Sequence, residues 1–277
     1  MSNAAKITGA TRLYAIVGDP IVQARSPEVY TERFAAAGID AVLVPAQVSA
    51  ENFDTVMPAL MALGNLDGLL VTSPFKARMV AYASRLGATA TCIGALNALR
   101  READGSWTGD MFDGAGFVRG IERKGERIRG RRVLMFGAGG AGSAIACALA
   151  GAGVESIAIV DLLDSRAEAL ASSLRAAFPD CELTTGTKPE DADMIVNAST
   201  VGMRPGDGMP SDVGPLASDT LVGDVVICES NTAIIRHAVA HGCKWVNGRD
   251  MHSGQIDALM GFLAPGSMRP RAVPADS

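Results

Sequence analysis

The stretch RRVLMFGAGGAGSAIACALAGAGVESIAIVD, residues 131–161, decides the fold that this sequence predicts. A short apolar run is followed by a glycine-rich loop at 137–142, by small residues that suit a helix to about Gly151, and by a second apolar run that ends at Asp161. Two short apolar strands joined through a helix form a βαβ unit, whose strands lie parallel in one sheet. The stretch therefore predicts an α/β layer built on a parallel sheet.

The glycine loop has the composition of a phosphate-binding turn. Gly137 permits a tight turn, Gly139 lets the backbone approach a pyrophosphate, and Gly142 or its small neighbours let the helix pack closely on the strand. The helix N-terminus then offers free N–H groups to the phosphates. Glycine loops also join strands to helices without binding a ligand, so the motif alone leaves both interpretations open.

Asp161 favours the first interpretation, because an acidic residue about twenty positions after the loop can accept hydrogen bonds from both ribose hydroxyls of a dinucleotide. A carboxylate there repels a 2′-phosphate, and Arg166 alone does not replace a basic cluster. We therefore expect a Rossmann-type, doubly wound domain that binds NAD in preference to NADP. The cofactor residues expected in this region are Gly137, Ala138, Gly139, Gly140, Ala141, Asp161 and Arg166.

The same alternation of strands and helices extends over the rest of the chain. Upstream, apolar strands are expected at 13–17, 41–48 and 66–74, followed by helices that begin near Pro27 after a Ser26 cap, near Glu51, and in a segment carrying Lys76. Downstream, strands are expected at about 181–185, 193–198 and 222–228, and helices at about 165–178, 232–242 and 253–263. Asp104-Gly105 differs from this pattern, because it suits the turn of a β-hairpin. We expect an N-terminal α/β domain over 1–110, the Rossmann domain over 111–242, and a disordered tail at 267–277.

Composition excludes several classes of function. The chain has 25 Lys and Arg against 30 Asp and Glu, without the basic stripe that nucleic-acid binding requires. Its apolar runs are shorter than the ~18 residues of a membrane span, and the N-terminus lacks the apolar segment of a secretory signal. The five cysteines show no CxxC spacing, so reduced thiols and a cytoplasmic location are expected. His237 and His241 could share one helix face, but no third ligand lies near them in sequence, so no metal is expected.

Five motifs together resemble the shikimate/quinate dehydrogenase family. They are VTSPFK (71–76), GALNALR (94–100), GDMFDG (109–114), GAGGAG (137–142) and NASTVGM (197–203). The resemblance covers nearly the whole chain. It implies an N-terminal substrate domain, a Rossmann domain, and a helix within 243–266 that packs back on the first domain.

The resemblance also implies the site residues. Lys76 and Asp113 correspond to the catalytic lysine and aspartate of the family, although by residue type alone each would be an ordinary surface charge. Oxidation of a secondary alcohol needs a base that takes the hydroxyl proton as the hydride leaves, and a lysine can serve as that base. The implied substrate residues are Ser26, Thr72, Asn97 and Gln255, and the further cofactor residues are Ser199, Thr200, Gly202 and Met203.

Four positions depart from the family pattern, and all four replace a polar contact by an apolar one. They are Ala24 for serine, Leu70 for asparagine, Ala98 for threonine and Ile227 for tyrosine. Each lost hydrogen bond to a carboxylate costs on the order of 1–3 kcal/mol, so shikimate should bind poorly unless Arg25 or another cation compensates. We expect the chemistry to be kept and the substrate to be altered.

The leading hypothesis is an NAD-dependent dehydrogenase of a ring secondary alcohol, with shikimate, quinate or a related cyclic polyol as substrate. In a narrower version shikimate or quinate is the substrate and its carboxylate is held from positions that the resemblance does not align. The alternative is a non-catalytic NAD-binding sensor or regulatory protein, against which the retention of Lys76 and Asp113 argues. A small-molecule partner is expected, and the protein could be a monomer or a homodimer.

Overall fold

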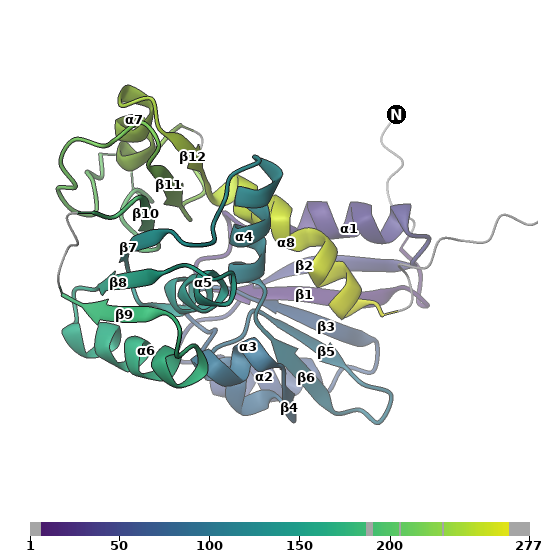
Figure 1. Ribbon diagram of the computed structural model, residues 1–277. Coiled ribbons are helices and arrows are strands. Elements are labelled where there is room, and N and C mark those ends of the chain that lie inside the picture. The colour runs from purple at the N-terminus through teal and green to yellow at the C-terminus, as the bar shows by residue number, and fades with distance from the viewer. Residues whose placement is uncertain (1–6, 187–190, 205, 229, 266–277) are drawn as a thin grey trace, which may run out of the picture. The chain divides into compact units, whose positions relative to one another are not determined.

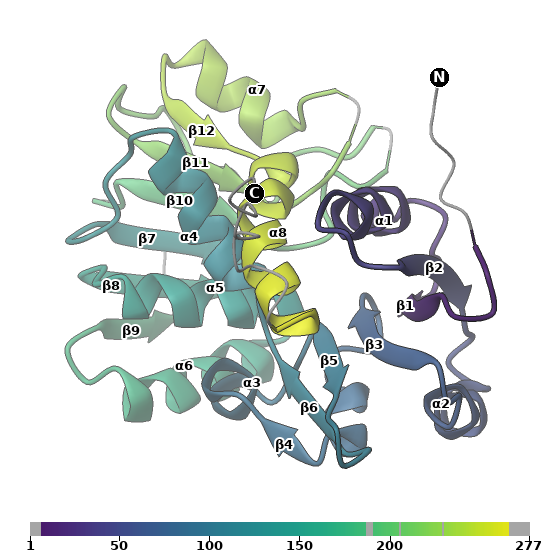
Figure 2. The ribbon, with the colours of Figure 1, turned by 90° about the vertical axis from the view of Figure 1, so that its right-hand side faces the viewer.

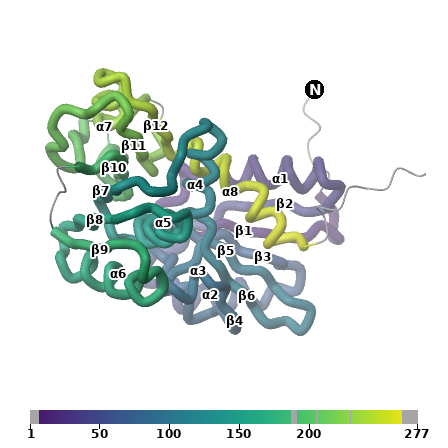
Figure 3. Tube along the Cα trace, in the orientation of Figure 1, coloured from purple at the N-terminus to yellow at the C-terminus, as the bar shows by residue number. Residues whose placement is uncertain are grey.

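The computed structural model describes residues 7–186, 191–204, 206–228 and 230–265, so the expected tail at 267–277 lies outside the described residues. The chain divides into two compact units. The first unit comprises Met1–Gly87, Ala95–Asp110 and Asp257–Ser277, and the second comprises Ala88–Gly94 and Met111–Ile256. Figures 1 and 3 show the course of the chain through these elements. Within the described ranges, no helix is both long and apolar enough to cross a membrane.

The first unit is built on a six-stranded sheet of order β2-β1-β3-β5-β6-β4. Strand β1 is parallel to β2 and β3, and β4 is parallel to β6, whereas β5 is antiparallel to β3 and β6. The elements of this sheet and its helices are β1 (Arg12–Gly18), α1 (Ser26–Ala36), β2 (Ala41–Gln47), α2 (Phe53–Met61), β3 (Leu66–Val71), the 3₁₀ helix η1 (Arg78–Tyr82), β4 (Arg85–Leu86), β5 (Ala98–Arg101) and β6 (Trp107–Asp110). The predicted hairpin turn is present, with Gly105 at φ +83°. The sheet is largely parallel, as predicted, because β5 alone runs against the other five strands.

Two local predictions in this unit are wrong. Ser26 does not cap α1, because the cap position is Arg25 and Ser26 is the first helical residue, followed by Pro27. Lys76 does not lie on a helix, since the next element, η1, begins at Arg78. After β3 the chain continues as an irregular loop instead of a helix, and the peptide bond between Ser73 and Pro74 in this loop is cis.

The second unit is an all-parallel sheet of order β12-β11-β10-β7-β8-β9, the expected Rossmann-type arrangement. Its elements are α3 (Ala88–Ile93), α4 (Asp113–Arg123), β7 (Arg132–Phe136), α5 (Gly140–Gly151), β8 (Ser156–Val160), α6 (Asp164–Ala177), β9 (Glu182–Thr185), β10 (Met194–Asn197), β11 (Leu221–Asp224), α7 (Ala233–Ala240), β12 (Lys244–Val246) and the first part of α8 (Gly248–Leu263). Sequence reasoning did not predict α3, α4 or β12.

Side chains alternate along β7 between the two faces of this sheet. Val133 and Met135 join a core with residues of α4, α5 and α6, whereas Leu134 and Phe136 join a core with residues of α7. Helices therefore cover both faces, and Figure 2 shows the second unit with α7 on one side of its sheet and α5 on the other.

The division by contacts differs from the predicted domain ranges in two places. Residues 88–94 belong to the second unit, where α3 packs against α5 and α6. Within 243–266, β12 pairs with β11 in the second sheet, so only the part of α8 from Asp257 onward belongs to the first unit. There Arg100 donates a hydrogen bond to the carbonyl of Phe262 (2.9 Å).

An aromatic cluster in the first unit supports the segment that carries Lys76. The ring of Phe53 on α2 is fully buried and stacks on Phe75, with ring centroids 4.3 Å apart. The edge of Tyr82 meets Phe53 at 5.7 Å, and the guanidinium of Arg78 lies 4.5 Å above its centroid. Phe53 therefore joins α2 to both Phe75 and η1.

We expect Phe53→Ala to lower the free energy of unfolding of the first unit by about 3–5 kcal/mol, because it removes a buried ring and leaves a cavity. Urea unfolding followed by Trp107 fluorescence measures this, in a Trp245→Phe background so that the remaining tryptophan reports on the first unit. The control is Val56→Ala on the same helix, where the side chain is 36% exposed, and we expect it to cost less than about 1 kcal/mol. Equal losses in the two variants would contradict the role given to Phe53.

Candidate functional site

In the first unit, backbone hydrogen bonds join three predicted site residues at the carboxyl ends of β1 and β3. The N–H of Thr72 donates to Val17 (2.9 Å), and the N–H of Leu96 donates to the carbonyl of Lys76 (3.0 Å). The N–H of Val71 donates to the carbonyl of Asn97 (2.8 Å). The structure thus brings Thr72, Lys76 and Asn97 together on one edge of the sheet, the edge at which α/β proteins bind ligands.

Close packing and burial limit the freedom of these side chains. A Cβ added at Gly18 would lie 2.3 Å from Cγ2 of Thr72, so only a glycine lets β1 approach this threonine. Asn97 and Ser26 are buried, at 6% and 8% exposure, and Lys76 is half-buried. Polar groups buried to this degree are held by hydrogen bonds, so their positions are well defined.

The apolar replacements in this unit also cluster. Leu70 and Ala98 are direct partners in the pairing of β3 with β5, so their side chains lie on the same face of the sheet. Both are buried, at 4% and 0% exposure, and Ala24 is half-buried. None of these three side chains can donate a hydrogen bond to a carboxylate.

In the second unit, Asp113 and Gln255 lie on helices that contact each other. Asp113 begins α4 and is 4% exposed, and Gln255 on α8 is 8% exposed. A Cβ added at Gly116 would lie 2.8 Å from Cβ of Gln255, and one added at Gly254 would lie 2.2 Å from the carbonyl oxygen of Gly116. Glycines thus let α4 and α8 approach closely, which places these two polar residues on neighbouring helices.

The glycine loop has the geometry that a dinucleotide needs. Gly137 has φ +101°, and a Cβ on Gly142 would lie 2.1 Å from the carbonyl oxygen of Gly137. Gly139 caps α5 in an extended conformation, and a Cβ added there would meet nothing within 4 Å. The open space at the start of a twelve-residue helix suits a pyrophosphate.

Asp161 is tied to this loop by its own carboxylate. One oxygen accepts a hydrogen bond from the N–H of Ala138 (2.7 Å), and the other accepts one from the N–H of Leu163 (3.0 Å). The carboxylate is therefore fixed beside the loop, where its remaining lone pairs can accept ribose hydroxyls. Arg166 is exposed on the first turn of α6.

The predicted residues of the loop after β10 are held by a buried polar network that sequence reasoning missed. Asn197 ends β10 and Asp224 ends β11, and the two are direct partners in the sheet. The amide of Asn197 donates to Asp224 (3.0 Å) and to the carbonyl of Val201 (2.9 Å). Asp224 also accepts from the N–H of Val226 (3.0 Å) and from the hydroxyl of Thr232. The sequence signal that could have predicted this network is a polar residue at the end of each of two apolar strands, Asn197 and Asp224.

This network fixes the segment expected to face the cofactor. The hydroxyl of Ser199 donates to the side-chain oxygen of Asn197 (2.6 Å), and Gly202, at φ +103°, packs against Thr232. Thr200 and Met203 are exposed. A Cβ added at Gly137 would lie 2.8 Å from Ser199 N, so the glycine loop and this segment are in contact.

Burial raises the pKa of Asp224 above its ordinary value of 3.8, and the hydrogen bonds from Thr232, from Val226 N–H and from Asn197 oppose this shift. The residues that donate to Asp224 thus also decide how well a charge is tolerated there.

His237 on α7 and His241, the C-cap of that helix, have no third potential metal ligand beside them among the described residues. Their ring centroids are 4.3 Å apart, His237 Nε2 contacts the carbonyl of Gly214 (2.8 Å), and His241 Nδ1 contacts the carbonyl of His237 (2.9 Å). Among the residues that the structure describes, no group of three or more potential metal ligands occurs.

Comparisons with known proteins agree with this geometry. The family model for the shikimate dehydrogenase substrate binding domain matches residues 16–99. The shikimate dehydrogenase (NADP(+)) of Rubrobacter xylanophilus is 35% identical over 253 residues, which cover 89% of this chain and 88% of that protein. The chain belongs to the shikimate/quinate dehydrogenase family.

Solved structures of this family match the whole fold. Shikimate 5-dehydrogenase from Listeria monocytogenes, in complex with shikimate and NAD, has a TM-score of 0.82 at 29% identity and covers 92% of each chain. Quinate dehydrogenase from Corynebacterium glutamicum, in complex with NAD, has a TM-score of 0.82 at 30% identity, with 92% of this chain and 94% of that chain covered. The protein is an NAD(P)-dependent alcohol dehydrogenase of this family, acting on CH–OH groups.

The buried network gives a test that depends on pH. Thr232→Val removes one of the donors that oppose the burial of the Asp224 charge, so the folded-state pKa of Asp224 rises further. A carboxyl whose folded pKa is raised favours the folded state at low pH and loses that stability as pH rises. We therefore expect Thr232→Val to cost about 1–3 kcal/mol at pH 7 and distinctly less at pH 4.

Chemical denaturation of wild type and variant at both pH values measures this difference. Thr232→Ser keeps the hydroxyl and is expected to stay near the wild type at both. A deficit of the same size at pH 4 and pH 7 would show that Thr232 acts through packing alone.

Proposed function

We propose that this enzyme interconverts a ring secondary alcohol and the corresponding ketone, with shikimate, quinate or a related cyclic polyol as substrate, and that Lys76 and Asp113 are its catalytic pair. The observation that carries the proposal is the setting of these residues. Lys76 is joined by backbone hydrogen bonds to the edge that bears Thr72 and Asn97. Asp113 lies buried on a helix that contacts the one bearing Gln255.

The reaction needs few protein groups. In the oxidative direction the C–H bond of the alcohol breaks as a hydride is lost, and the hydroxyl proton is lost with it. The bound nicotinamide accepts the hydride. The Nζ atom of Lys76 takes the proton as general base, and in the reductive direction it returns that proton to the ketone oxygen. Asp113 supplies the carboxylate that accepts a hydrogen bond from a neighbouring ring hydroxyl.

We expect Lys76→Ala to lower kcat by at least about 100-fold, because general-base catalysis typically contributes 10²–10⁴-fold, and to leave NAD affinity nearly unchanged. Initial rates and NAD titration of the purified protein measure the two quantities. The control Lys244→Ala removes an exposed lysine on β12 and is expected to be silent. Full activity of Lys76→Ala would exclude this lysine as the base, and a wild type that turns over no alcohol would revive a role in sensing NAD.

The cofactor that we propose is NAD. The support is Asp161, whose carboxylate is held beside the glycine loop by the N–H groups of Ala138 and Leu163. A negative charge fixed at this point repels a 2′-phosphate. The Listeria and Corynebacterium structures contain NAD, whereas the Rubrobacter relative and other curated relatives are named for NADP(+), so the names of the relatives favour NADP and the proposal rests on Asp161.

We expect wild type to prefer NAD over NADP in kcat/KM, and Asp161→Ala to lower the ratio of the two values by at least about 10-fold, since the variant loses hydrogen bonds to ribose and the repulsion of the 2′-phosphate. Parallel assays with both cofactors measure the ratio. The matched control Asp164→Ala removes a carboxylate three residues later, on the first turn of α6, and is expected to leave the ratio unchanged. A wild type that prefers NADP would overturn the assignment.

A further inference from the structure

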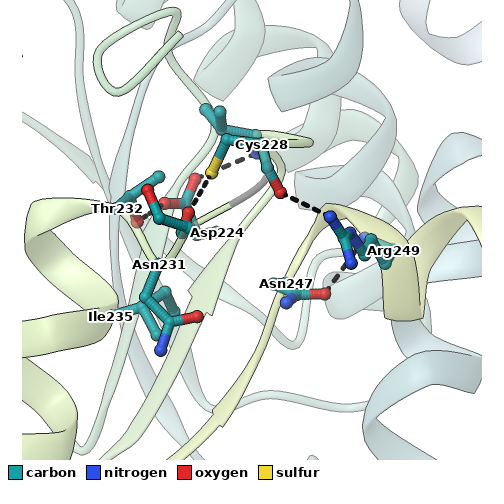
Figure 4. Close-up of a pocket in the computed structure, with 9 residues that line it drawn as sticks. Asp224, Cys228, Asn231, Thr232, Ile235, Asn247 and Arg249 are labelled. Atoms are coloured by element: carbon teal, nitrogen blue, oxygen red, sulfur yellow. Dashed lines mark hydrogen bonds between the residues drawn. The ribbon is translucent and has the colours of Figure 1, made fainter. Parts of the chain in front are cut away.

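A small polar pocket in the second unit adjoins the buried network of Asp224 and Thr232. Its volume is about 60 Å³, and it lies beyond the carboxyl ends of β11 and β12. Figure 4 shows the side chains around it, among them Asp224, Cys228, Asn231, Thr232, Asn247 and Arg249. This volume is enough for a small group such as a carboxylate or a few waters.

Arg249 is held at this pocket by the backbone around it. A Cβ added at Gly248 would lie 2.4 Å from the carbonyl oxygen of Val225 and 2.7 Å from the side chain of Ile227, so the start of α8 packs directly on the end of β11. One guanidinium nitrogen of Arg249 donates to the carbonyl of Cys228 (2.9 Å), as Figure 4 shows. That bond uses one of the five N–H donors of the guanidinium.

Asn247 adds a second donor whose orientation is determined. Its side-chain oxygen accepts hydrogen bonds from the backbone N–H groups of Arg249 (3.0 Å) and Asp250 (3.2 Å). An amide oxygen that accepts two backbone donors leaves the NH₂ group on the opposite side, so this assignment follows from the hydrogen bonds. Figure 4 shows the oxygen of Asn247 turned toward Arg249 and its nitrogen turned away.

Asp224 is the one carboxylate among the described lining residues, and both of its oxygens already accept hydrogen bonds. One oxygen accepts from Asn197 and Val226, and the other accepts from the hydroxyl of Thr232. The thiol of Cys228 donates to the carbonyl of Ser230 (2.6 Å). The groups left to meet a ligand are therefore mainly donors, led by a guanidinium, which is the composition of an anion site.

The strand order places this pocket on the substrate side of the sheet. The glycine loop follows β7, and Asp161 follows β8. A dinucleotide with its pyrophosphate at β7 and its adenosine ribose at β8 would direct its other half toward β10 and β11. The pocket lies two strand spacings from β7 in that direction, about 10 Å, outside the carboxyl ends of the strands, where open α/β sheets bind their ligands.

We propose that Arg249, assisted by Asn247, binds the carboxylate of the substrate. The inference rests on the proposed function and selects among its substrates: ring acids such as shikimate or quinate, not uncharged rings. Ile227 cannot donate a hydrogen bond to a carboxylate, but Gly248, the residue before Arg249, packs directly on this isoleucine. Arg249 is therefore close enough to Ile227 to supply the missing donor. A bidentate guanidinium can donate hydrogen bonds to a carboxylate, which the side chains of Ala24, Leu70, Ala98 and Ile227 cannot do.

The test is Arg249→Gln, assayed with shikimate, quinate and an uncharged cyclic polyol such as inositol. For the acids we expect KM to rise about 10- to 100-fold, since a hydrogen bond between two charged groups is lost. We expect kcat and the KM for NAD to change less than about threefold, because the charge acts on binding and not on the chemical step. The KM for the uncharged ring should not change. Arg249→Lys keeps the charge without the planar fork and should recover part of the affinity.

The matched control is Arg236→Gln on α7. The guanidinium of Arg236 donates to the carbonyl of Asn231 (2.6 Å), a residue that lines the pocket. The substitution therefore removes an exposed arginine close to the same pocket. We expect the KM of this control to stay within about threefold of the wild type, because hydrogen bonds to a ligand act at short range.

The outcomes separate this inference from the proposed function. Turnover of the acids with unchanged KM in Arg249→Gln, or turnover of uncharged rings alone, overturns the inference and leaves the proposed function standing. If no ring alcohol is turned over, the proposed function fails. Calorimetric binding of quinate and shikimate to both proteins in the presence of NAD then decides the inference: weaker binding to the variant supports it, and equal binding or none overturns it.

Discussion

The buried carboxylate of Asp224 is the group on which the carboxyl edge of the second sheet depends. Asn197 Nδ2, the N–H of Val226 and the hydroxyl of Thr232 all donate to it. Through Asn197 it holds the segment that bears Ser199, and through Thr232 it meets Gly202. Burying a carboxylate costs folding free energy unless its oxygens accept hydrogen bonds, so we expect the loss of one donor to loosen all of these elements.

The first unit positions its polar residues by a different means. Backbone hydrogen bonds link the ends of β1 and β3 to the segments that bear Thr72, Lys76 and Asn97, while the stacked rings of Phe53 and Phe75 support the same loop from beneath. A rigid backbone combined with an apolar support gives a catalytic side chain a fixed origin without using further polar groups. The second unit thus fixes its candidate site residues by buried polar contacts, and the first unit does so by backbone hydrogen bonds and packing.

The pattern of kept and lost residues has a physical logic. The residues proposed to handle the proton and the ring hydroxyls are present, whereas the positions expected to hold a carboxylate are all apolar, with Leu70 and Ala98 directly paired. Such a change alters what binds more than what reacts. A guanidinium at the start of α8 can restore recognition of an anion from a new direction, since charge and donor geometry matter more than which strand supplies them.

The sequence by itself determined the elements, because their periodicity and glycine signals are local: the βαβ unit at 131–161, its glycine loop and the hairpin at Gly105 were predictable from short stretches. It did not show that α3 and β12 join the second unit or that Ser26 follows the cap of α1. The pairing of Asn197 with Asp224, 27 residues apart, and the approach of Arg249 to Cys228, 21 residues apart, exist only once parallel strands align their carboxyl ends. Tertiary structure alone decided these contacts, since strand order and burial convert separate polar residues into one site.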